Sequence, residues 1–84
     1  MTVEDIQEEV RGYVLESFLP DTPAEAFGNG DDLFALLDSL QVLRLVVQLE
    51  RLFGVKVTDA DLTAENLSSV ERVAAFVARA GSQG

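Results

Sequence analysis

The chain of 84 residues contains no cysteine and no histidine. Without cysteine it can form no disulfide bond and no cysteine-based metal or redox site. Without histidine it lacks the base that activates serine and cysteine nucleophiles in many hydrolases. We therefore expect no catalytic residue and no metal site, and any thiol chemistry would require a thiol from outside the chain.

Positive charge is also scarce, with 6 basic against 15 acidic side chains and a net charge of -9. Nucleic acid or an anionic membrane would repel such a chain, so neither is an expected partner. There is no basic start followed by an apolar leader, and no apolar run of membrane-spanning length, so we expect a cytoplasmic protein. The acidic excess lies entirely before Ser39, because residues 1–38 hold ten acidic side chains against Arg11 alone.

With 48% apolar and 25% charged residues, the composition is typical of a soluble globular domain. The length allows one modest core. We expect a single domain over residues 1–84, with an ordered core at about 3–80 and a tail at 81–84.

Apolar side chains recur at helical spacing in three segments, which predicts an all-α fold. We expect a small four-helix bundle of three main helices and one short helix, with a long loop between the first and second helices. The first helix spans residues 2–18, with Thr2 as a plausible N-cap, and ends near Leu19 because Pro20 and Pro23 follow. Its apolar face consists of Val3, Ile6, Val10, Tyr13 and Val14.

Residues 20–32 contain both prolines of the chain, two glycines and several acids, which predicts a long irregular connection. Loops of this length in a small domain are either functional or disordered. Asp31 and Asp32 could suggest acid–base chemistry or a magnesium contact, but a solvated loop is the simpler interpretation. We expect the end of the loop to be pinned on the core by Leu33, Phe34, Leu36 and Leu37.

The longest apolar helical pattern begins after Asp38. Asp38 is a good N-cap, and Gln41, three residues later, can complete a capping box. Ser39 would then be the first residue of the helix, with a hydroxyl that is free to point outward. An anion attached there would meet unpaired backbone N–H groups and the positive end of the helix dipole. The alternative is a serine that is merely tolerated in the first turn.

Residues 40–53 carry two apolar faces. We assign the first to the core: Val42, Leu45, Val46, Leu49 and Phe53. A polar stripe faces water: Gln41, Arg44, Gln48 and Arg51. The second apolar face, which we call the apolar strip, is Leu40, Leu43 and Val47. Either the preceding loop covers the apolar strip or, as we favour, it is an exposed docking surface for a partner protein.

The rest of the chain predicts one short and one long helix. Gly54 suits the end of the preceding helix, and residues 55–57 read as an extended connector. Thr58 and Asp61 have the spacing of a cap for a brief turn through residue 62. Ser68 and Glu71 have the spacing of a capping box for a last helix. Its predicted buried face is Val70, Val73, Ala74 and Val77.

The sequence resembles the acyl and peptidyl carrier protein family along nearly its whole length, from the first helix to Ala80. The resemblance lies in Asp38-Ser39-Leu40 at the start of an apolar helix, then Glu50, Phe53-Gly54-Val55, and Ser69-Val70 at the start of the last helix. It implies that a dedicated phosphopantetheinyl transferase moves 4′-phosphopantetheine from coenzyme A to the hydroxyl of Ser39, using magnesium. The thiol of this arm would carry an acyl or aminoacyl group as a thioester between enzymes, and the chain itself would not be an enzyme.

The resemblance also implies a partner surface on the helix after Ser39, at Asp38, Leu40, Leu43, Arg44 and Val47. Carriers of fatty-acid synthesis are strongly acidic along this helix, whereas Arg44 and Arg51 stand here. A basic partner would be repelled at these two positions. We therefore expect partners that use the apolar strip and the acidic loop, and we prefer a polyketide or related specialised pathway, such as antibiotic biosynthesis, to fatty-acid synthesis.

The expected partners are the transferase, a ligase or adenylation enzyme that loads the arm, and ketosynthase or condensation enzymes that process the cargo. We expect a monomer, and Met1 with a natural-looking end favours a discrete carrier over a piece of a larger synthase. Three alternatives remain open. The chain could be a peptidyl or aminoacyl carrier of a nonribosomal pathway, a helical interaction module without a prosthetic group, or a small hydrolase using Ser39. The absence of histidine disfavours the last.

Overall fold

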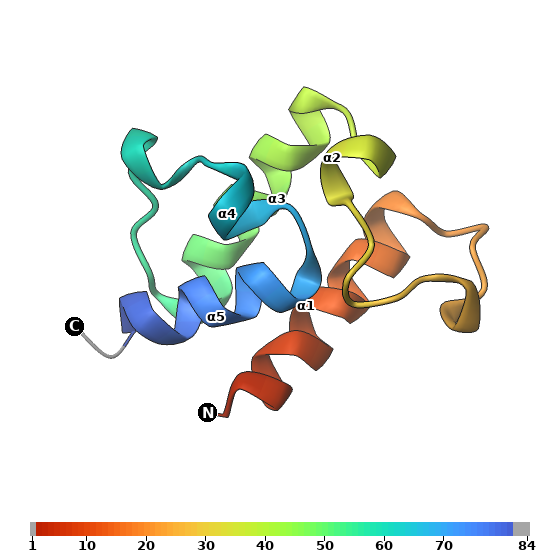
Figure 1. Cartoon of the computed structure of the whole chain (residues 1–84), viewed down its shortest axis with the longest axis horizontal. Coiled ribbons are helices and arrows are strands. Elements are labelled where there is room, and N and C mark those ends of the chain that lie inside the picture. The colour runs from red at the N-terminus through yellow and green to blue at the C-terminus, as the bar shows by residue number, and fades with distance from the viewer. Residues whose placement is uncertain (1, 82–84) are drawn as a thin grey trace.

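The structure, a computed structural model, describes residues 2–81. Within this range the chain is all-α and contains no strand (Figure 1). Three long helices build the domain: α1 (Val3–Phe18), α3 (Ser39–Phe53) and α5 (Val70–Gly81). Two single-turn helices, α2 (Leu33–Leu36) and α4 (Ala64–Leu67), and two 3-10 turns at Ala24–Ala26 and Asp59–Asp61 lie between them. The predicted all-α bundle with three main helices is confirmed.

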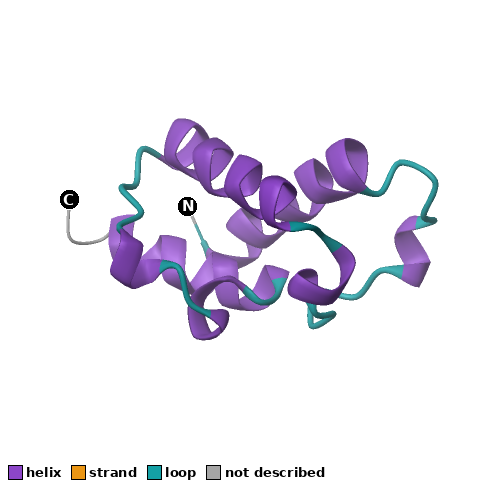
Figure 2. Ribbon diagram, turned by 90° about the horizontal axis from the view of Figure 1, so that it is seen from above, coloured by secondary structure: helices purple, strands orange, loops and turns teal. Residues whose placement is uncertain are grey.

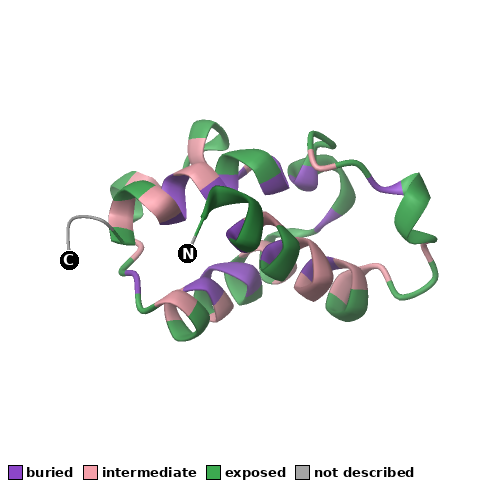
Figure 3. Cartoon of the chain, turned by 90° about the horizontal axis from the view of Figure 1, so that it is seen from below, coloured by how far each residue is buried: buried purple, intermediate pink, exposed green. Residues whose placement is uncertain are grey.

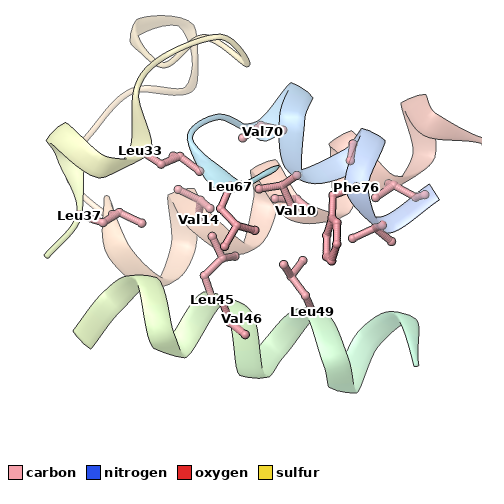
Figure 4. Packing of buried hydrophobic residues seen from close by; sticks show 14 of the residues in the cluster. Val10, Val14, Leu33, Leu37, Leu45, Val46, Leu49, Leu67, Val70 and Phe76 are labelled. Carbon is pink, nitrogen blue, oxygen red and sulfur yellow. The ribbon is translucent and has the colours of Figure 1, made fainter. Parts of the chain in front are cut away.

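The core lies where the three long helices meet. α1 and α5 pack against each other, and α3 closes the core from the opposite side, with Leu45 and Leu49 pointing toward them and Val46 also buried (Figure 4). The buried residues lie on the inward sides of the helices, and the outer surfaces are exposed (Figure 3). The predicted inner faces are confirmed at their centres, namely Ile6, Val10 and Val14 on α1, the three α3 residues, and Val70, Val73, Ala74 and Val77 on α5.

The edges of these faces are less buried than predicted. Val3 is exposed, and the predicted core residues Tyr13, Val42 and Phe53 are only partly buried.

Among residues 2–81, none of the helices has both the length and the apolar character that a membrane-spanning helix requires. The longest connection, between α1 and α2, protrudes at one end of the molecule (Figure 2).

The predicted ends of α1 and α3 are confirmed. The hydroxyl of Thr2 accepts a hydrogen bond from the backbone N–H of Asp5 at 3.1 Å, and α1 ends at Phe18, with Leu19 as its C-cap before Pro20. α3 ends at Phe53 and its C-cap is Gly54, whose φ of 67° lies in the left-handed region that glycine adopts without steric cost. In the connector that follows, the backbone N–H of Val57 donates to the carboxylate of Glu50 at 2.9 Å.

Replacing Gly54 with alanine is expected to lower the free energy of unfolding by about 1 kcal/mol, because alanine is strained at a positive φ. An added Cβ would meet no atom within 4 Å, so the backbone alone accounts for the cost. Gly12, inside α1, has equally open surroundings and serves as a matched control. There the same change should stabilise by about 0.5–1 kcal/mol. Urea denaturation measures both, and a loss at Gly12 or a gain at Gly54 would contradict the helix boundaries.

The predicted capping box between Ser68 and Glu71 is wrong. α5 begins one residue later than expected, and the hydroxyl of the buried Ser69 caps it by accepting from the backbone N–H of Arg72 at 3.1 Å. The carbonyl of Ser68 instead accepts from the N–H of Leu33 at 2.7 Å. The backbone of Ser68 is therefore bonded to a segment that is distant in the sequence, which local spacing does not indicate.

The brief turn predicted from Thr58 and Asp61 is confirmed as the 3-10 turn at Asp59–Asp61, where the N–H of Thr58 donates to the carboxylate of Asp61 at 3.1 Å. The single-turn helices α2 and α4 were not predicted. Of the residues expected to pin the loop, Leu33 and Leu37 are buried but Phe34 and Leu36 are exposed. Gly81 belongs to α5 rather than to the tail, and residues 82–84 of the predicted tail lie outside the described range.

Candidate functional site

The junction before α3 has the predicted capping box. The carboxylate of Asp38 accepts a hydrogen bond from the N–H of Gln41 at 2.8 Å, and the side-chain oxygen of Gln41 accepts from the N–H of Asp38 at 3.0 Å. The N–H of Val42 donates to the carbonyl of Asp38 at 3.0 Å, as the first regular turn requires. α3 therefore begins at Ser39, and two reciprocal hydrogen bonds fix the backbone on either side of this residue.

Ser39 is exposed, and its hydroxyl is not needed for the cap. The backbone N–H groups of Ser39 and Leu40, the first two of the helix, have no hydrogen-bond acceptor within residues 2–81. Such groups give the start of a helix a partial positive charge. A phosphate ester at Ser39 would lie beside these free donors and this charge, so the junction fits an attached phosphodiester.

A groove of about 380 Å³ opens beside Ser39. It lies where α2, α3 and α4 come together, and its lining is mainly apolar: Phe34, Leu37, Asp38, Ser39, Val42, Leu43, Leu62 and Leu67. Phe34 and Leu62 are large side chains that remain exposed at this groove. The groove could hold an apolar chain that is tethered at Ser39.

The apolar strip is exposed on α3. Leu40, Leu43 and Val47 expose 58%, 52% and 51% of their surfaces, so the preceding loop does not cover them. Three large apolar side chains half open to water on one helix face form a surface that a partner protein could bury. The strip begins at Leu40, directly after Ser39, so a partner bound to it would lie close to the serine hydroxyl.

Arg11 holds the loop that leads to Ser39, a role that the sequence analysis did not predict. Its guanidinium donates to the side-chain oxygen of Asn29 at 3.0 Å and to the carbonyl of Ala24, and lies 5.1 Å from the centre of the Phe27 ring. The backbone carbonyl of Asn29 in turn accepts from the N–H of Glu71 at 3.1 Å. The loop is thus bonded to both α1 and α5. One signal in the sequence does point to Arg11: it is the single basic residue among ten acidic residues in the segment 1–38.

The paired acids of the loop have local structural roles. Asp31 accepts from the N–H of Gly28 at 2.9 Å, and Asp32 caps α2 by accepting from the N–H of Phe34 at 2.9 Å. Within residues 2–81, no group of three or more acidic side chains is placed to hold a metal ion. These contacts favour the interpretation of Asp31 and Asp32 as loop residues.

Comparison with known proteins identifies the family of the chain. A search of curated proteins found no match. A sequence profile described as the phosphopantetheine attachment site matches residues 14–77. The matched segment begins in α1, ends in α5 and includes all of α3. The chain therefore belongs to the phosphopantetheine attachment site family, whose members are noncatalytic carriers of covalently bound 4′-phosphopantetheine.

Proposed function

We propose that Ser39 is the residue that carries the 4′-phosphopantetheine arm and that residues 1–84 form one acyl carrier domain of a polyketide or related specialised pathway. The observation that carries the proposal is the exposed hydroxyl of Ser39 at the first position of α3, inside the segment matched by the family. When bound, the arm supplies a terminal thiol on which acyl groups travel as thioesters.

The other serines are less suited to this role. Ser17 is exposed but lies near the C-terminal end of α1, where the helix dipole disfavours an anion. Ser68 is partly buried at the end of α4, and Ser69 is buried and occupied as the cap of α5. Among the described serines, only Ser39 combines exposure with the start of a long helix.

The residues around Ser39 have roles in binding and positioning. Asp38 fixes the first turn of α3 through its hydrogen bond to Gln41, which places the exposed Ser39 at the first position of the helix. The groove beside Ser39 offers apolar contacts to the cargo. Leu40, Leu43 and Val47, with Asp38 and Arg44 beside them, form the surface on which the transferase and the loading and processing enzymes dock.

The preference for a specialised pathway is supported by the charge of α3. Arg44 and Arg51 are exposed on the helix and leave it without a continuous acidic face. A partner that requires an acidic helix would meet repulsion at both positions. The exposed apolar strip provides a binding surface that does not depend on acidic residues.

The native form of the protein tests this proposal. The chain would be isolated from the cells that produce it, and its intact mass and the mass of the peptide containing Ser39 would be measured. We expect one phosphopantetheine arm on Ser39, with an acyl group that contains no amino nitrogen. An aminoacyl cargo would overturn the polyketide assignment in favour of a peptidyl carrier, and an arm on another residue would overturn the assignment of Ser39.

A further inference from the structure

Two of the five arginines differ from the rest in having no partner among residues 2–81, the part of the chain that the structure describes. Three of them donate hydrogen bonds: Arg11 to Asn29, Arg72 to the backbone of Glu65, and Arg79 to Asn66. Arg44 and Arg51 are exposed and make no hydrogen bond or ion pair with any residue of the described range 2–81. In a chain with 15 acidic side chains, two unpaired guanidinium groups on one helix are available to an outside carboxylate.

Both arginines lie beside the apolar strip. Arg44 and Arg51 line one groove of about 370 Å³ together with Leu40, Leu43 and Val47. Arg44 follows Leu40 by four residues, and Arg51 follows Val47 by four, so each cation lies one turn beyond an apolar residue on the same face. The two arginines are seven positions apart in the sequence, which corresponds to about 10.5 Å along the helix axis. The surface therefore presents apolar contacts with two cations along one edge.

We propose that the partner which docks on α3 presents an acidic and apolar surface, with apolar side chains over the strip and carboxylates opposite Arg44 and Arg51. This inference rests on the proposed carrier function and specifies the chemistry of its partner. The charges elsewhere on the chain support it. Basic surfaces are attracted to the acidic outer face of α1, whose exposed residues include Asp5, Glu8, Glu9 and Glu16, and are repelled by the two arginines.

A second copy of the chain is a poorer occupant than such a partner. Its α1 could offer acids to the two arginines, but two chains with a net charge of -9 repel each other as they approach. A partner whose acids are confined to one patch avoids this repulsion. Apolar contact on the strip then provides affinity, and the paired charges select the orientation.

A pair of designed helical peptides tests the inference. Both carry a leucine stripe, flanked at seven-residue spacing by glutamate in one peptide and by lysine in the other. Each is titrated into the protein with the arm attached, and the methyl signals of Leu40, Leu43 and Val47 are followed by NMR. We expect the glutamate peptide to shift these signals, with a smaller effect at high salt, and the lysine peptide to perturb α1 instead. Binding of the lysine peptide at the strip with equal or greater affinity would overturn the proposal.

Charge-reversal variants test whether Arg44 and Arg51 are the groups that bind the glutamate peptide. The double variant Arg44→Glu and Arg51→Glu should weaken binding of the glutamate peptide about tenfold, because two attractions become two repulsions. Lys56→Glu is the matched control, since Lys56 is an exposed cation that lies in the connector after α3 and lines a different groove. Equal weakening by Lys56→Glu would show a general charge effect and contradict the inference. If the unaltered protein formed dimers and the double variant were monomeric, a second copy of the chain would be the occupant of this surface instead.

The native partners provide a second test. A photo-reactive residue at position 43, on the strip, would be activated in the producing cells, and the linked residues of the partners would be mapped by mass spectrometry. We expect the linked patch to be rich in aspartate, glutamate and apolar residues, whereas a patch rich in lysine and arginine would overturn the proposal. Failure of the carrier function would appear separately, as the absence of an arm on Ser39 in the same samples.

Discussion

Replacing Ser39 with alanine is expected to abolish attachment of the phosphopantetheine arm. The hydroxyl oxygen of Ser39 is the atom that would form the bond to phosphorus, and alanine has no atom in its place. The fold should persist, because Ser39 is exposed and the capping hydrogen bonds belong to Asp38 and Gln41. An exposed substitution of this kind should change the free energy of unfolding by no more than about 0.5 kcal/mol.

The measurement is the intact mass after incubation with coenzyme A, magnesium and a broad-specificity phosphopantetheinyl transferase. The unaltered protein should gain the mass of one arm, and Ser39→Ala should gain none. Ser17→Ala removes another exposed hydroxyl and should be modified as efficiently as the unaltered protein. If Ser39→Ala still gained an arm, the assignment of Ser39 would be wrong. The hydrolase alternative would be supported by a different result: the unaltered protein hydrolyses esters but gains no mass, and Ser39→Ala no longer hydrolyses them.

Replacing Leu45 with alanine is expected to cost about 2–5 kcal/mol of stability. Leu45 is 1% exposed and points from α3 toward the helices that close the core (Figure 4). Alanine would remove its apolar contacts and leave a cavity among well-packed neighbours. A domain of this size has a total stability of roughly 4–13 kcal/mol, so this single change could remove a large part of it.

Leu43 provides the matched control, because it is the same residue type on the same helix but 52% exposed. Leu43→Ala should lower the free energy of unfolding by less than about 1 kcal/mol, as expected for an exposed position. Urea denaturation followed by circular dichroism would give both values. Equal losses for the two variants would contradict the orientation of α3. Normal stability with weaker partner binding in Leu43→Ala would support the role of the strip in docking.

Features that depend on neighbouring residues could be predicted from the sequence. The capping box of Asp38 and Gln41 spans three residues, and the start of α3 follows from it. The buried faces of the long helices follow from helical periodicity, because each helix has a side that only the core can cover. The apolar strip is exposed, as expected for an apolar face that helical periodicity places apart from the core face.

Features that depend on distant contacts could not be predicted in this way. Ser68 and Ser69 are adjacent, and both residue types suit a helix cap. In the structure Ser69 caps α5, and the backbone carbonyl of Ser68 accepts a hydrogen bond from the N–H of Leu33. α2 is too short to show helical periodicity, so its exposed Phe34 was assigned to the core. The role of Arg11 depends on a loop 13 to 18 residues away, which no local pattern specifies.

The attachment of the loop between α1 and α2 bears on how a thiol tethered at Ser39 would reach its enzymes. Hydrogen bonds tie this loop to Arg11 on one side and to the backbone of Glu71 on the other. α2 follows the loop directly, and its N–H at Leu33 is bonded to Ser68. An arm on Ser39 would therefore be anchored next to segments that are hydrogen-bonded to both α1 and α5, and the radius of its swing would be the length of the pantetheine chain. Enzymes farther away than this radius can be served only when the whole carrier tumbles or changes its docking site.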